Sequence, residues 1–299
     1  MVDNRSLGRS VHFYNALSPD DALGGLILNQ SVTEKKFLFM LEILIVASNP
    51  YNPGQYDIRS NAPGGDIFLI LSLRFRSTDV ESGTIHITDE PCITRVYSGA
   101  GSGRTEQFRN QVRKRDRKCV ITGTVNTRAY RDLWFGFEAA HVFPLSDGQL
   151  FVDSGLSRWI TNREGEHDSG INSCQNGLLM QTNIHQEFDS FSFSINPDDN
   201  YKIISFADDP FKIDGRVLDP SCRAANSGRS VRDELLRWHF RQAVLVNMRG
   251  AGEPGFEMDF PPGTDMMGEI FKGPEAAKRM EAELFLRLDG LSWQKGLSH

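Results

Sequence analysis

Three short stretches in the middle of the chain decide the fold: Phe137-Glu-Ala-Ala-His-Val-Phe-Pro144, Asn176-Gly-Leu-Leu-Met180 and Thr182-Asn-Ile-His-Gln-Glu-Phe-Asp189. The first is an apolar run that ends in histidine and then proline, which predicts a strand. The second is an apolar run opened by asparagine, and it predicts another strand. The third places His185 and Asp189 four residues apart, so on a helix both side chains lie on one face.

This order of elements resembles the HNH nuclease family, whose core is the ββα-metal motif. The closest branch is written roughly C-x-x-T-G, E-A-A-H-I-x-P, N-G-L-x-L and H-x-x-F-D. This chain reads CVITG from Cys119, then EAAHVFP, NGLLM and HQEFD in the same order. The resemblance covers residues 106–200, about a third of the chain, and the flanks resemble those of uncharacterised fungal proteins that carry this domain.

The resemblance implies a metal-dependent endonuclease that hydrolyses the phosphodiester bonds of nucleic acid, with DNA as the first expectation. It assigns His141 as the general base, a role that suits histidine because its ordinary pKa of about 6.5 leaves it neutral at pH 7. His185 and Asp189 would hold a divalent cation that stabilises developing charge, Mg²⁺ first, with Mn²⁺ or Zn²⁺ as alternatives. Asn176 completes the catalytic pair with His141 by fixing the loop through side-chain hydrogen bonds.

Ala140 departs from the wider family pattern. Many HNH enzymes carry Asp or His immediately before the base as a metal ligand, whereas this branch carries alanine. The metal therefore has one protein ligand fewer, and water or Glu138 would have to replace it. This departure keeps open a weak or inactive HNH scaffold that binds nucleic acid or a protein without cutting. A third possibility is a structural interaction protein whose N-terminal domain is the functional part.

A basic run precedes the first motif. Residues 104–118 hold seven basic residues against Glu106 and Asp116, a local charge of +5 on a chain of net charge −6. Phe108 and Val112 are four apart, so one helical face can pack while the arginines point outward. This run is either a solvated helix face or a helix that contacts phosphates. The candidate phosphate contacts are Arg109, Arg113, Arg115 and Arg117.

We expect an α+β protein in three parts. Residues 1–103 form an N-terminal α+β domain of unknown role, in which Ser31 and Glu34 resemble a capping box before a buried helix over 32–46. Strand-like runs follow at 66–76, 84–88 and 93–98. Residues 104–210 form the HNH nuclease domain, which a glycine-rich linker at 99–103 precedes.

Residues 211–299 form a C-terminal helical support region. Ser230 precedes one helix that ends near Gly250, and Pro274 opens a second. The insert between the first two motifs, residues 146–173, is either a DNA-contacting loop or plain surface, and surface is the favoured interpretation.

Composition limits the remaining possibilities. Of 299 residues, 39% are hydrophobic and 24% are charged, which is ordinary for a globular protein and excludes a disordered chain or a fibre. The acidic balance argues against a protein that coats nucleic acid by bulk charge. Four cysteines without a CxxC pair predict reduced, buried thiols. Without an apolar run long enough for a membrane span or a signal peptide, we expect no membrane partner and an intracellular protein of the nucleus or cytoplasm. The oligomeric state stays open.

Overall fold

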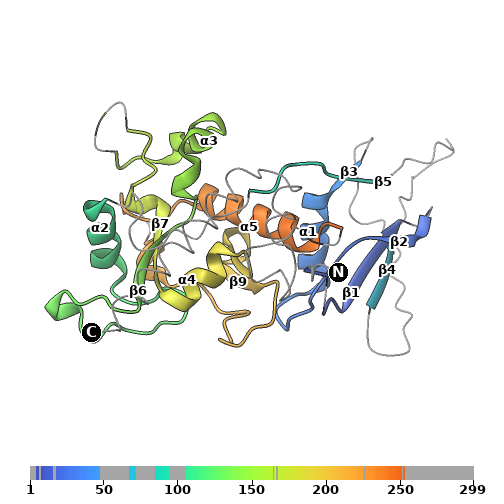
Figure 1. Ribbon diagram of the computed structural model, residues 1–299, viewed down its shortest axis with the longest axis horizontal. Helices are drawn as coiled ribbons and strands as arrows, with labels where there is room; N and C mark the ends of the chain where they lie inside the picture. The colour runs from blue at the N-terminus through green and yellow to red at the C-terminus, as the bar shows by residue number, and fades with distance from the viewer. Residues whose placement is uncertain are drawn as a thin grey trace, which may run out of the picture.

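The computed structural model describes residues 5–6, 8–15, 18–47, 67–71, 85–93, 105–163, 165, 168–224, 227–250 and 252. The linker at 99–103, the run at 94–98 and the helix expected from Pro274 lie outside these residues. Within them, helices mix with four small sheets, which agrees with the α+β class (Figure 1). None of the helices in the described part of the chain has the length and apolar character that crossing a membrane requires.

The three decisive stretches form a β-hairpin followed by a helix. Strand β6 (Phe137–His141) pairs antiparallel with β7 (Gly177–Gln181), and His141 lies opposite Gly177. Helix α4 (Thr182–Asp189) begins at the residue after β7 and packs back on the hairpin (Figure 1). The CVITG stretch forms a turn, in which the Gly123 N–H donates to the carbonyl oxygen of Cys119 at 2.8 Å.

The hairpin is covered on both faces. Successive side chains of a strand point to opposite faces, so odd-numbered and even-numbered residues of β6 and β7 separate. The odd-numbered face packs on helix α2 (Glu106–Asp116) through Ala139, Leu179, Phe108 and Val112. The even-numbered face packs on α4 through Ala140, Leu178, Met180, Ile184 and Phe188. The hairpin is therefore a buried layer between two helices.

The insert between the strands contributes to the core. Helix α3 (Gly148–Asp153) lies between two 3₁₀ turns, Leu145–Asp147 and Leu156–Trp159. Phe151, Ile160 and Ile171 are buried in the same cluster as the even-numbered face of the hairpin. The surface interpretation of residues 146–173 therefore holds only for part of the insert.

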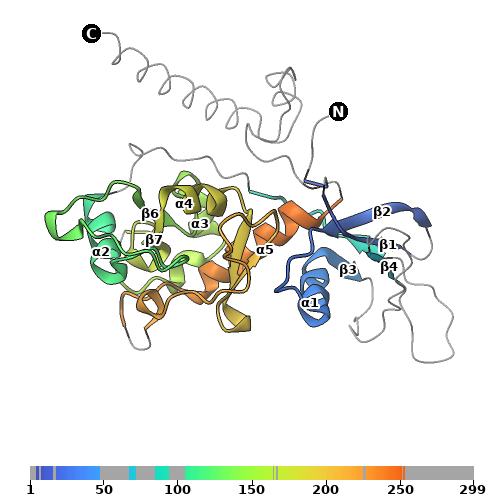
Figure 2. The same ribbon diagram turned by 90° about the horizontal axis from the view of Figure 1, so that it is seen from below.

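Helix α5 (Asp233–Met248) connects the two halves of the molecule. It packs along strand β8 (Phe193–Asn196), which pairs antiparallel with β9 (Lys202–Ser205). Its first turns bury Leu235 and Leu236 in the cluster around the hairpin, and its later turns bury Val244 and Leu245 in a second cluster. The helix begins after Arg232 rather than at the expected Ser230 cap. It runs across the middle of the molecule, between the hairpin and the N-terminal sheet (Figures 1 and 2).

The N-terminal half is built on a three-stranded sheet of order β2-β1-β4. Its strands are β1 (Val11–Asn15), β2 (Ser18–Leu26) and β4 (Ile67–Leu71), and β1 pairs parallel with β4. Helix α1 (Glu34–Leu44) runs into β3 (Ile45–Ala47), which pairs with β5 (Ile85–Ile87). The sequence did not predict β1 and β2.

The capping box expected at Ser31 is wrong. Thr33 is the N-cap of α1, and its hydroxyl accepts from the Lys36 N–H. The Ser31 hydroxyl instead donates to a carboxylate oxygen of Asp214 at 2.6 Å. A partner so distant in the chain is invisible to a local sequence pattern.

The N-terminal sheet docks on the end of α5. A Cβ added at Gly24 would lie 2.0 Å from the carbonyl oxygen of Met248, so only glycine permits this approach. Arg9 is buried and donates to the carbonyl oxygens of Asn247 and Gly250, where the helix leaves carbonyls unsatisfied. Burial lowers the pKa of Arg9 to about 10.

Candidate nuclease site

His185 lies between two carboxylates. Its Nδ1 atom is 2.6 Å from Oε2 of Glu138, and its Nε2 atom is 3.0 Å from Oδ2 of Asp189. His185 and Asp189 are buried one helical turn apart on α4, as the sequence predicts, whereas Glu138 comes from β6. Glu138 was named only as a substitute ligand. The signal that places it here is the strand period, because Glu138 and Ala140 share the face that α4 covers.

The side chains of Glu138, His185 and Asp189 can accommodate a divalent cation in only one arrangement. The two carboxylates approach opposite nitrogens of the imidazole, so a single ion cannot contact the ring and both carboxylates as they lie. In the described part of the chain, no group of three or more His, Cys, Asp or Glu side chains could hold a metal ion. The residues fit if Nε2 of His185 and Asp189 are the ligands, while Glu138 accepts a hydrogen bond from Nδ1 and fixes the ring, as carboxylates commonly do behind a metal-bound histidine.

Asn176 holds the chain that follows β6. Its side chain accepts from the Phe143 N–H at 2.8 Å and donates to the carbonyl oxygens of Phe143 at 3.1 Å and Ile171 at 2.9 Å. Its own carbonyl oxygen accepts from the Val142 N–H at 2.9 Å. Asn176 is completely buried, so these bonds replace water for every polar atom involved. They fix the two residues after His141.

His141 lies at the end of β6 and turns toward α2. Its ring stacks on Phe108 with the centroids 4.0 Å apart and an interplanar angle of 7°. Nε2 lies 3.2 Å from Oδ1 of Asn172, and the residue is 4% exposed. His141 is therefore on the odd-numbered face of the hairpin, opposite the face that carries His185. The structure brings His185 and Asp189 together, and brings Asn176 beside the end of β6, but it does not bring the two histidine rings onto one face.

Arg115 is a structural arginine. Its guanidinium donates to Asp116 and to the carbonyl oxygens of Cys174, Gly177 and Arg229. Although burial works against the charge, the hydrogen bond and ion pair with Asp116 raise the pKa of Arg115. The structure thus corrects its assignment as a phosphate contact, since all five N–H groups are used inside the fold.

Arg109 and Arg113 lie on one flank of α2. The Arg113 guanidinium is 5.0 Å from the centre of the Trp134 ring. Trp134 belongs to the loop that leads to β6. Burial, and then the charge of Arg109, lower the pKa of Arg113, whereas Asp132 of the same loop acts in the opposite direction. Arg117 is exposed and ends α2 in the left-handed conformation, with φ of 60°. These three arginines remain on the surface or at its edge, where an anion can reach them.

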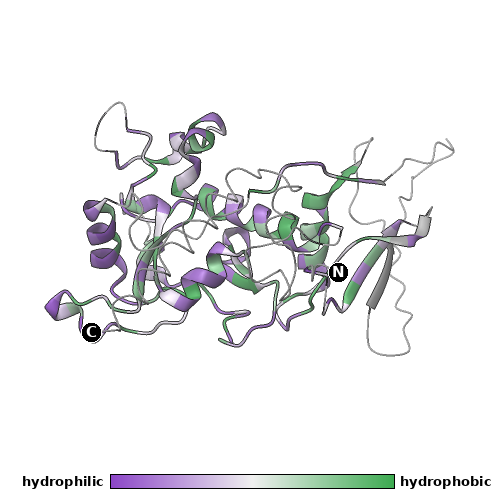
Figure 3. Ribbon diagram, viewed as in Figure 1, coloured by the Kyte–Doolittle hydropathy of each residue, from purple (hydrophilic) through white to green (hydrophobic). Residues whose placement is uncertain are grey.

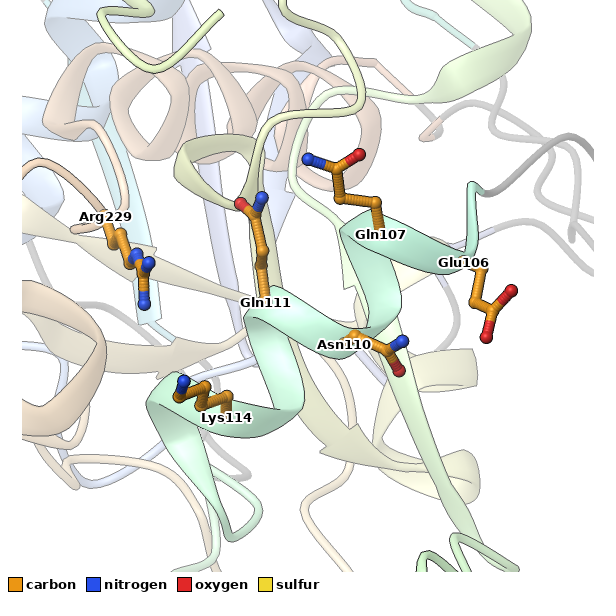
Figure 4. Close-up of a pocket in the computed structure, with 6 residues that line it drawn as sticks. All are labelled: Glu106, Gln107, Asn110, Gln111, Lys114 and Arg229. Carbon is orange, nitrogen blue, oxygen red and sulfur yellow. The ribbon is translucent and has the colours of Figure 1, made fainter. Parts of the chain in front are cut away.

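The other flank of α2 borders a shallow hollow. Figure 4 shows the residues that line it, Glu106, Gln107, Asn110, Gln111, Lys114 and Arg229. Three of its six side chains are amides, one is acidic and two are basic. None of the candidate catalytic or metal-binding residues lines this hollow, so it is separate from the site. The hydropathy colouring shows how strongly polar α2 is beside the apolar strands β6 and β7 (Figure 3).

The four cysteines are free thiols, as the sequence predicts. Cys119, Cys174 and Cys222 are buried, whereas Cys92 is half-buried. Burial raises the pKa of the Cys222 thiol far above its ordinary value. Their positions supply neither a disulfide nor a zinc ribbon.

Comparison with known protein families identifies this region. Residues 119–196 match the HNH endonuclease family, so the stretch from the CVITG turn through β8 is an HNH-family domain. Such a domain indicates a nuclease-type function on nucleic acid. Residues 8–53, which include β1, β2, α1 and β3, match a domain of unknown function (DUF8573). No curated protein and no solved structure gives a significant match.

Proposed function

We propose that the protein is a metal-dependent HNH endonuclease that hydrolyses phosphodiester bonds, with DNA as the first substrate to test. The observation that carries the proposal is the Glu138–His185–Asp189 arrangement, in which carboxylate oxygens lie 2.6 and 3.0 Å from the two nitrogens of a buried imidazole. An imidazole held in this way presents Nε2 beside a carboxylate oxygen, and these two donor atoms would bind a cation together.

Each site residue then has a separate task. His185 and Asp189 hold the cation, which when bound supplies Lewis-acid stabilisation of the charge that develops on the phosphate. Glu138 orients the His185 ring. To take the proton of the attacking water, the His141 ring would have to turn from the hairpin face that α2 covers toward the face that carries His185. Asn176 keeps the end of β6 in place. Arg109, Arg113 and Arg117 contact phosphates of the bound strand.

The ligand chemistry favours Mn²⁺ or Zn²⁺ over Mg²⁺. One imidazole nitrogen and one carboxylate oxygen form a mixed pair, and imidazole suits transition metals better than the hard Mg²⁺ ion. Mg²⁺ also retains most of its water and is usually bound by oxygen ligands. We therefore expect activity with Mn²⁺ at lower metal concentrations than with Mg²⁺.

The test is nicking of supercoiled plasmid by the full-length protein with Mg²⁺, Mn²⁺ or Zn²⁺, and with EDTA. His141→Ala and His185→Ala should abolish nicking, and His86→Ala, an exposed histidine on β5, is the matched control. Glu138→Gln should weaken the apparent metal affinity about 10- to 100-fold while full metal restores part of the rate. Nicking that persists in His141→Ala would contradict the assignment of the base.

The second candidate is an HNH scaffold that binds nucleic acid without cutting it. The favouring observation is that His141 is only 4% exposed and stacked on Phe108. If no metal supports nicking while the protein still shifts DNA on a gel, and the shift survives His141→Ala and EDTA, this binding function replaces the nuclease.

A further inference from the structure

The loop between α2 and β6 exposes large aromatic side chains. Tyr130 is 77% exposed and Phe135 is 78% exposed, and Val125 and Leu133 beside them are exposed as well. We call residues 125–135 the aromatic loop. It forms the end of the molecule farthest from the N-terminal sheet, beside α2, in both views (Figures 1 and 2). Exposed apolar side chains that follow one another within a short loop are a common mark of an interaction surface.

The aromatic loop is well tied by its own hydrogen bonds. The Asn126 side chain is buried, donates to the carbonyl oxygen of Leu133 at 2.8 Å and accepts from the Arg128 N–H at 3.0 Å. The indole N–H of Trp134 donates to Asp132 at 2.7 Å. The fold therefore holds Tyr130 and Phe135 out in solvent, since looseness of the loop does not explain their exposure.

Cations lie among the aromatic rings. The Arg131 guanidinium is 5.1 Å from the centre of the Tyr130 ring, and Arg128 is exposed nearby. On the α2 side, Arg113 lies over Trp134, and the Nε atoms of Arg109 and Arg113 are buried with no hydrogen-bond partner among the described residues. Asp132 is the acidic residue of the loop. Arginines interleaved with aromatic rings suit a ligand that combines negatively charged phosphates with planar bases.

The aromatic loop also borders the candidate nuclease site. The carbonyl oxygen of Gly136, which follows the loop, accepts from the Thr182 N–H at the start of α4 at 3.0 Å. Glu138 follows Gly136 by two residues on β6. A nucleic-acid strand held on the loop would thus lie beside the beginning of β6, which carries Glu138, and the beginning of α4, which leads to His185.

We propose that the aromatic loop binds nucleic acid with unpaired bases, which stack on Tyr130 and Phe135 while arginines contact the phosphates. Bases within a duplex are already stacked on each other, so exposed aromatic faces favour single strands. The further step, that single-stranded nucleic acid is also what the protein cuts, rests on the proposed function.

The test is fluorescence anisotropy with a labelled oligo-dT strand and a labelled duplex of the same length. The full-length protein is used in EDTA, so that cleavage does not interfere. Tyr130→Ala and Phe135→Ala should each weaken single-strand binding roughly 10-fold and change duplex binding little. Phe135→Tyr should keep the affinity. Val152→Ala, which removes an exposed side chain of α3, is the matched control.

Salt dependence separates stacking from charge. Arg128→Ala and Arg131→Ala should lower the slope of binding against salt, whereas Tyr130→Ala should lower affinity at an unchanged slope. Unchanged single-strand binding in both aromatic variants would overturn the inference. So would an equal loss of affinity for the duplex in these variants, or a wild-type protein that binds neither the single strand nor the duplex. Altered self-association with unchanged anisotropy would assign the loop to a protein contact instead.

The outcomes stay distinct from those of plasmid nicking. If the wild type nicks plasmid and the aromatic variants bind single strands normally, the inference fails and the nuclease stands. If the loop binds single strands but no metal supports cutting, the inference stands as a binding surface and the nuclease fails.

Discussion

Asn176→Asp tests whether the buried amide holds the chain after His141. The substitution keeps size and shape and keeps an oxygen that accepts from the Phe143 N–H. It removes the two N–H groups that donate to the carbonyl oxygens of Phe143 and Ile171 at 3.1 and 2.9 Å. A buried polar group left without its partner costs about 1–3 kcal/mol, so two carbonyls facing a carboxylate should cost about 4 kcal/mol.

The loss should depend on pH. A carboxylate buried against two carbonyl oxygens is stabilised by protonation, so its folded-state pKa lies above the unfolded value of about 3.9. The folded variant then binds the proton more tightly than the unfolded chain. Its stability relative to wild type should therefore fall as pH rises through the folded pKa and recover as pH falls from about 8 toward about 5.

The assay is urea unfolding followed by tryptophan fluorescence at several pH values, with the wild type measured beside the variant. Asn110→Asp is the control, because Asn110 is exposed on α2 and should shift stability by less than about 0.5 kcal/mol. A neutral-pH loss below about 1 kcal/mol, or a loss that does not change with pH, would refute the role given to Asn176.

Three further predictions address packing. Arg115→Lys should lower the free energy of unfolding in urea by about 3 kcal/mol, because an ammonium cannot donate the five hydrogen bonds that the guanidinium makes beside buried Asp116. Arg117→Lys, at an exposed position, should change it by almost nothing. Equal small effects of the two would contradict a structural role for Arg115. Gly177→Ala should cost about 1–3 kcal/mol, because the new Cβ would lie 2.6 Å from Cε2 of Phe108. Gly165→Ala is its control, because among the described residues no atom lies within 4 Å of the added Cβ, and an equal effect of the two would disprove the close packing. Native protein should react with a thiol reagent chiefly at half-buried Cys92, and the other cysteines should react only in denaturant; rapid native labelling of Cys222 would contradict its burial.

Much of the HNH-family domain could be predicted from the sequence, because its elements follow local periods. The apolar run ending at His141 is a strand, and the spacing of His185 and Asp189 puts both on one face of α4. The apolar pair Phe108 and Val112 packs as the helical period requires. Such periods depend only on neighbours in the chain.

The features that the sequence missed depend on distant partners. Arg115 appears in the sequence as one more member of a basic run, yet carbonyl groups about 60 and 114 residues away surround it. Ser31 meets Asp214, which leaves Thr33 to cap α1. The face of His141 follows from strand alternation, but its stacking depends on the position that α2 takes. No local pattern contains these contacts.

The fold divides the charge of the basic run in a way that is compatible with the proposed binding of a polyanion by an acidic protein. The Arg115–Asp116 pair is already counted in the +5, and Lys118 pairs with Asp219 at 2.6 Å, so one further positive charge is neutralised within the fold. Arg109 and Arg113 remain on the flank of α2 that faces the aromatic loop, where Arg128 and Arg131 add to them. Binding through so few cations gives a shallow dependence on salt. The remaining affinity would then come from contacts that salt does not screen, and the proposed stacking of bases on Tyr130 and Phe135 would supply that contribution.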